Sequence, residues 1–150
     1  MKNKLLSKNS VRVGLYSSLL LIAIAPLSVF IHEEGHLIIC ASEGHTYTMS
    51  IGIFGGVLHC SGALSNPLLF FAFGGVFAGI VLSGPFIAWK KINQYPFLVI
   101  PLVSLISGHL VNAAVETFLS RWYFDNMAEA SIIINAIVAA IFLATWIKTS

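Results

Sequence analysis

Four apolar segments, each close to the length needed to cross a lipid bilayer, take up most of this chain. They cover residues 13–41, 67–89, 95–119 and 130–147, and a membrane-spanning helix needs about 20 apolar residues. Only 9% of the 150 residues are charged, whereas a soluble domain has about 25%. We therefore predict one all-α, multi-pass integral membrane domain over residues 1–150, with about four transmembrane helices in contact with the lipid bilayer.

The basic residues are distributed unevenly between the two predicted sides of the membrane. With an even number of spans, both termini and the 90–91 loop lie on one side. That side collects Lys2, Lys4, Lys8, Arg12, Lys90, Lys91 and Lys148, and the other side keeps Arg121. The positive-inside rule then places both termini in the cytoplasm and the 42–66 and 120–129 loops outside. The net charge of +2, without a basic block, argues against nucleic acid as a partner.

A signal peptide is the competing interpretation of the N-terminus. Basic residues precede the first apolar segment, and Ala23-Ile24-Ala25 resembles a cleavage site. Pro26 follows the cut, however, and the apolar run continues well beyond it. We therefore favour a retained transmembrane helix that continues to Ala41.

The sequence His32-Glu33-Glu34-Gly35-His36 interrupts the first apolar run. Histidines spaced i, i+4 lie about one helical turn apart on one face, which suits two nitrogen ligands of a single Zn²⁺. Glu33 could then act as general base on a zinc-activated water. The alternative is a chance pattern at a polar helix end. Ionisable groups beside an apolar span are rare and usually functional, so we favour a Zn²⁺ site.

A catalytic zinc site usually has three protein ligands, so a third is expected near the two histidines. The candidates with metal-binding side chains are His45, His59, His109, Asn112, Glu116, Asp125 and Glu129. His109, Asn112 and Glu116 share one face of the third predicted helix, which brings Glu116 to about the depth of His36. Asp125 opens the fourth predicted helix on the same side. Each carboxylate has a simpler role available, Asp125 as a helix N-cap and Glu116 as an interfacial charge.

These features resemble the site-2 protease family of intramembrane zinc metalloproteases. The resemblance covers the order of elements over most of residues 13–148, and the HEEGH motif is its specific part. It implies that His32 and His36 bind zinc, that Glu33 is the catalytic base, and that the substrate is a membrane protein or a peptide. The family generally opens its site towards the cytosol, which is opposite to the orientation that the lysine and arginine residues predict.

The resemblance also bears on the third ligand. In the family this ligand is the aspartate of an Asn-x-x-Pro-x4-Asp-Gly motif, and Asn112 and Asp125 occupy comparable places in the order of elements. No proline follows Asn112 at that spacing, and Asn126 stands where the family has glycine. We therefore expect Asp125 as the third ligand, with Glu116 as the alternative.

The polar connection between the first two spans predicts a β-hairpin. Thr46–Phe54 and Val57–Cys60 are extended in character, and Gly55-Gly56 between them suits a two-residue turn. A free strand edge could hold an unwound substrate; the alternative is a loop that lies in the membrane interface. His59 would then be a polar edge residue, a substrate contact or an accessory ligand.

Two further sets of small residues have simple explanations. Cys40 and Cys60 could pair if both face an oxidising compartment, but we interpret them as ordinary small apolar residues. Gly74-Gly75 and Gly79 predict close packing of the second helix against the HEEGH helix.

Taken together, these features predict a zinc metalloendopeptidase that hydrolyses peptide bonds in or beside the bilayer. Polar residues of the third helix, Ser107, His109 and Asn112, either line a path for water or bridge helices. The alternative is a non-proteolytic membrane protein that binds or transports a divalent metal through His32, His36, Glu116 and His109. A third possibility, a catalytically dead scaffold, would not need the intact Glu33.

Overall fold

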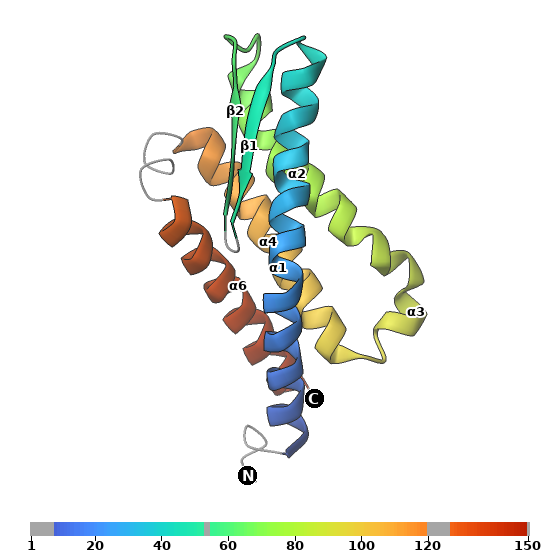
Figure 1. The fold of residues 1–150 in the computed structure, drawn as a ribbon. Helices are drawn as coiled ribbons and strands as arrows, with labels where there is room; N and C mark the ends of the chain where they lie inside the picture. The colour runs from blue at the N-terminus through green and yellow to red at the C-terminus, as the bar shows by residue number, and fades with distance from the viewer. Residues whose placement is uncertain (1–7, 53–54, 120–126, 150) are drawn as a thin grey trace.

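The computed structural model describes residues 8–52, 55–119 and 127–149 of the chain, which form long helices and one β-hairpin (Figure 1). In chain order the elements are α1 (Lys8–Ser42), β1 (Tyr47–Ile51), β2 (Gly56–Cys60), α2 (Pro67–Ser83), the 3-10 helix η2 (Gly84–Ala88), α3 (Trp89–Ile92), α4 (Pro96–Phe118) and α6 (Met127–Thr149). The long helices alternate in direction, so α1 begins and α6 ends at the end of the molecule opposite to the connection between α1 and β1.

Three helical segments are long and apolar enough to cross a membrane: Val11–Ser42, Pro67–Ile92 and Pro96–Phe118. In α6 the described residues include a shorter apolar stretch, Ile133–Phe142. The predicted helical architecture with a small hairpin is therefore confirmed, and the count of four transmembrane helices stays a prediction.

The helices expose apolar side chains and bury polar ones, as expected for a protein surrounded by lipid. Exposed residues include Leu15, Leu19, Ile22, Ile80, Ile137 and Ile141. Buried residues include His32, Glu33, His36, Ser104, His109, Asn112 and Glu116. This distribution is consistent with a membrane protein whose polar groups face one another.

Local signals set the helix ends. Helix α1 continues through Pro26 as one element and stops before Gly44, whose φ of 76° is the left-handed conformation that ends many helices. Asn66 caps α2 by accepting a hydrogen bond from the Leu69 amide at 3.0 Å, and Pro67 follows as the first helical residue. The second predicted span is not one regular helix, because α2 ends at Ser83 and a 3-10 turn leads into α3.

Glycines let α2 approach its neighbours closely. Of the three that were predicted to pack against the HEEGH helix, Gly74 does so, and Gly75 and Gly79 lie against α4 instead. A Cβ at Gly35 of α1 would lie 2.8 Å from the Gly74 Cα and 2.9 Å from the Phe73 carbonyl oxygen. On the other face of α2, Gly75 lies against α4 at Ala113. Small residues at these crossings bring the HEEGH segment and α4 together around α2.

The predicted hairpin is present, but its turn is not at Gly55-Gly56. The strands are antiparallel, with Ile51 opposite Gly56, so Gly56 already belongs to β2. The Gly52 amide donates to the Gly55 carbonyl at 2.8 Å and closes the connection. A two-residue turn of the expected type needs positive φ, and Gly44 is the one described residue with positive φ.

Cys40 and Cys60 form a disulfide, so the pairing that the sequence left open is present and the interpretation of both as ordinary small apolar residues is wrong. The bond joins the last turns of α1 to the end of β2, and both strands pack against α1. Around it, Cys40, Leu58 and Phe70 form a buried apolar cluster shared by α1, β2 and α2. The hairpin is thereby held beside the HEEGH segment instead of extending away from it (Figure 1).

Candidate metal centre

Three helix ends meet at the end of the bundle that carries the hairpin base. His36 lies six residues before the end of α1, or about 9 Å along the helix axis. Phe70 is in the first turn of α2, and Glu116 is in the last turn of α4. Because these helices alternate in direction, residues far apart in sequence reach the same depth.

The side chains of His32, His36 and Glu116 converge at this depth, and their ligand atoms all lie within 4.8 Å of one another. Glu116 Oε1 is 3.2 Å from His32 Nε2, and Glu116 Oε2 is 3.3 Å from His36 Nε2. The two Nε2 atoms are 3.0 Å apart. Ligands bound tetrahedrally at ~2.0–2.1 Å are about 3.3 Å from each other, so this buried group could hold a metal ion.

A backbone contact requires a proton on Nδ1 of His36. Its Nδ1 donates a hydrogen bond to the carbonyl oxygen of Phe70 at 2.8 Å, and the Phe70 ring packs against the imidazole with centroids 4.8 Å apart. A neutral imidazole with its proton on Nδ1 has a free lone pair on Nε2. His36 therefore directs that lone pair at Glu116 and at Nε2 of His32, which is the arrangement of a metal ligand.

Glu33 follows His32 in α1, and its side chain is buried beneath the hairpin. The backbone amide of Leu58 interacts with its carboxylate, which is also near His32, His36 and Glu116. A Cβ at Gly56 would lie 2.6 Å from the Glu33 Cγ, so strand β2 passes directly over this carboxylate. The structure therefore places a second, separate carboxylate beside the candidate metal-binding group of His32, His36 and Glu116.

The other candidate ligands whose side chains the structure describes do not join this group. Asp125, the expected third ligand, lies outside the described residues, and the side chain of Glu129 is not described either. His59 is exposed on β2 opposite Thr48. His45 hydrogen-bonds the Ala63 carbonyl at the hairpin base. Over the described part of the chain, His32, His36 and Glu116 form the one group of three or more such side chains that could hold a metal.

His109 lies next to the group without belonging to it. Its Nδ1 is 3.1 Å from Nδ1 of His32, on the opposite side of that ring from the Glu116 contact. Asn112, one turn further along α4, is also buried and has no hydrogen-bond partner for its Oδ1. The polar face that the sequence predicted for the third helix therefore points into the bundle.

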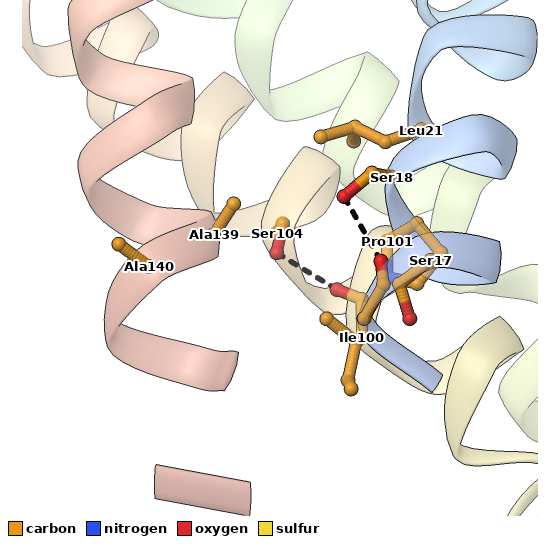
Figure 2. Close-up of a pocket in the computed structure, with 9 residues that line it drawn as sticks. Ser17, Ser18, Leu21, Ile100, Pro101, Ser104, Ala139 and Ala140 are labelled. Atoms are coloured by element: carbon orange, nitrogen blue, oxygen red, sulfur yellow. Dashed lines mark hydrogen bonds between the residues drawn. The ribbon is translucent and has the colours of Figure 1, made fainter. Parts of the chain in front are cut away.

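A cavity of about 100 Å³ lies between α1, α4 and α6, away from the metal-binding group (Figure 2). Ser18 and Ser104 at its wall hydrogen-bond carbonyls of their own helices, those of Gly14 and Ile100. Ser17, which also lines it, precedes His32 by 15 residues, or about 22 Å along α1. None of His32, His36 and Glu116 lines this cavity.

Sequence reasoning missed three features of the site: the Phe70 carbonyl, the Leu58 amide and the disulfide. Backbone groups carry no signal in a sequence. The disulfide did have a sequence signal, because Cys40 follows His36 by four residues and therefore lies on the same face of α1.

Comparison with known protein families, with curated proteins and with solved structures finds no significant match. Two imidazole nitrogens and a carboxylate form a donor set used by catalytic zinc sites, and the neighbouring carboxylate can accept a proton.

Proposed function

We propose that this protein is a membrane zinc metalloendopeptidase, with His32, His36 and Glu116 as the metal ligands and Glu33 as the general base. The observation that carries the proposal is the convergence of two imidazole nitrogens and one carboxylate, with contacts of 3.0–3.3 Å, beside a further carboxylate that is not among them. Glu116 replaces Asp125, which the resemblance to site-2 proteases favoured, because Glu116 contacts both histidines.

A cation bound between His32, His36 and Glu116 would account for the short distances between their Nε2 and carboxylate oxygen atoms. With His36 protonated on Nδ1, two Nε2 atoms and a carboxylate face one another in a buried space. Buried charges and lone pairs without a partner cost free energy. A proton shared between His36 and Glu116 is the alternative to a metal, and metal analysis distinguishes the two.

The metal, Glu33 and the hairpin have separate roles in the proposed reaction. When bound, zinc supplies a Lewis acid that polarises the scissile carbonyl and acidifies water. Glu33 takes the proton from the attacking water and delivers it to the leaving amine. The hairpin over Glu33 limits contact of this carboxylate with lipid and leaves its position set by Leu58 and Gly56.

The hairpin also offers a place for an extended substrate. In an antiparallel pair, alternate residues direct their backbone groups outward. The bonds from Gly52 to Gly55 and from Ser61 to Thr46 mark the hydrogen-bonded pairs. The backbone groups of Leu58, opposite Met49, therefore point away from β1 while its side chain stays buried, and its N–H meets the Glu33 carboxylate. A substrate segment unwound next to this edge could pair with the hairpin while its peptide bond lies near the site.

We further propose that both termini are cytoplasmic and that the metal centre lies nearer the outer face. The seven-to-one distribution of basic residues supports this orientation. The Cys40–Cys60 disulfide supports it independently, because structural disulfides persist in oxidising compartments and are rare in the cytosol.

A protein that only binds or transports a divalent metal is the competing function. The same three ligands would serve it, and a buried Glu33 would then have no chemical task. Replacing Glu33 by glutamine therefore separates the two functions.

The test is peptide cleavage by purified protein carrying Glu33→Gln, with Glu34→Gln as the matched control. Glu34 is the adjacent residue, is half-buried, and is outside the metal-binding group. We expect Glu33→Gln to keep its zinc and to lose cleavage, and Glu34→Gln to keep both. Full activity of Glu33→Gln, or a wild-type protein without zinc, would reject the proposal.

A further inference from the structure

We infer that His109 is a positioning residue, which holds His32 in the tautomer and ring orientation that leave its Nε2 free to bind metal. The inference rests on the proposed metal centre and extends it, because His109 is not one of the three ligands. It follows from the contact between His32 and His109, from the tautomer that metal binding requires, and from the packing that fixes His109.

The contact joins the two Nδ1 atoms at 3.1 Å, and both imidazoles are buried, with 6% and 5% of their residue surfaces exposed. The ring planes are inclined by 33°, with centroids 5.2 Å apart. At this distance one proton bridges the two nitrogens in a hydrogen bond. The direction of that hydrogen bond determines, for each neutral ring, whether Nε2 carries a proton or a free lone pair.

Metal binding through Nε2 requires that His32 carry its proton on Nδ1. That proton then points at Nδ1 of His109, which must accept it and so must itself be unprotonated there. His36 is held in the same way by a different acceptor, the Phe70 carbonyl of α2. The two histidine ligands are thus oriented by two different helices, α2 through its backbone and α4 through a side chain.

The position of His109 is fixed by its neighbours on both sides. A Cβ at Gly75 of α2 would overlap the His109 carbonyl oxygen, and a Cβ at Gly108 would overlap the Asn135 side chain of α6. Close contacts therefore hold this turn of α4 between two helices. They fix the backbone that carries His109, whose ring contacts His32 in the way that outer partners contact metal-bound histidines.

The experiment compares zinc dissociation constants of His109→Asn, His109→Gln and His109→Leu, measured on purified full-length protein by competition with a chelator. The amide oxygen of asparagine can occupy the place of Nδ1, whereas that of glutamine reaches the place of Nε2. Leucine offers no acceptor. We expect affinity close to wild type for His109→Asn and a loss of about 10–100-fold for the other two variants.

This order separates positioning from packing, because asparagine is the smallest of the three replacements and fills the site least. Ser104→Ala is the control for a change in the buried face of α4, since that hydroxyl only bonds the Ile100 carbonyl. Equal affinities for all three variants, or an asparagine variant as weak as the leucine variant, would overturn the inference while leaving the metal centre intact.

A measurement on the wild type keeps the test independent of how the variants fold. In ¹⁵N-histidine NMR spectra of the zinc-loaded protein, His109 should carry its proton on Nε2 and His32 on Nδ1. A proton on Nδ1 of His109 would overturn the inference. Absence of zinc from the wild type would instead overturn the metal centre and the inference with it.

Discussion

The backbone of Gly56 lies against the side chain of Glu33. A Cβ at position 56 would be 2.6 Å from the Glu33 Cγ and 2.9 Å from its Oε1. Gly55 precedes it in the same hairpin, and a Cβ there would meet nothing within 4 Å. Both glycines have backbone conformations open to other residues. The two glycines therefore differ in their contact with the proposed base.

Gly56→Ala should displace Glu33 and slow peptide cleavage while leaving the zinc content unchanged. A shift of about 1 Å in a catalytic group can lower the rate by about 100-fold. Gly55→Ala should cleave at close to the wild-type rate. Cleavage assays and metal analysis on the two variants decide the matter, and an unimpaired Gly56→Ala protein would show that the hairpin does not position Glu33.

Features that depend on local sequence could be predicted, and the helices are the clearest case. Length and apolar character placed the helices within a few residues, except where Gly84 and Pro85 introduce a 3-10 turn. The pairing of His32 with His36 is equally local, because it follows from the helical repeat alone.

Features that depend on how distant segments meet could not be predicted. The predicted depth in the membrane did not distinguish Glu116 from Asp125 as the third ligand. Glu116 reaches both histidines because α4 packs against α1. The disulfide likewise depends on the hairpin folding back onto α1. The glycine pair was misread because Gly56 is required for a close approach to Glu33 and not for a turn.

Breaking the disulfide should destabilise the hairpin and the site beneath it. The bond closes a loop of sequence separation 20, so Cys60→Ser should lower the free energy of unfolding by about 3 kcal/mol. Thermal unfolding in detergent, with Ser50→Ala on exposed β1 as the control, measures the change. Two free thiols titrated in unreduced, denatured wild-type protein would contradict the prediction.

The orientation of the chain should be visible to an impermeant thiol reagent. The native cysteines are paired, so a single introduced cysteine reports alone. We expect Ser65→Cys to react in intact cells and Lys91→Cys to react only after lysis, because these residues lie at opposite ends of α2 and its extension. The reverse pattern would place the metal centre nearer the cytosol.

The most direct test of the metal centre is the zinc content of purified wild-type protein beside that of Glu116→Ala, Asp125→Ala and His59→Ala. Loss of one of three ligands should weaken zinc binding by several kcal/mol, on the order of the share of binding free energy each ligand carries. We predict bound zinc in the wild type, in Asp125→Ala and in His59→Ala, and its loss from Glu116→Ala. A wild type without zinc, or a Glu116→Ala protein that keeps its zinc while Asp125→Ala loses it, would contradict the assignment.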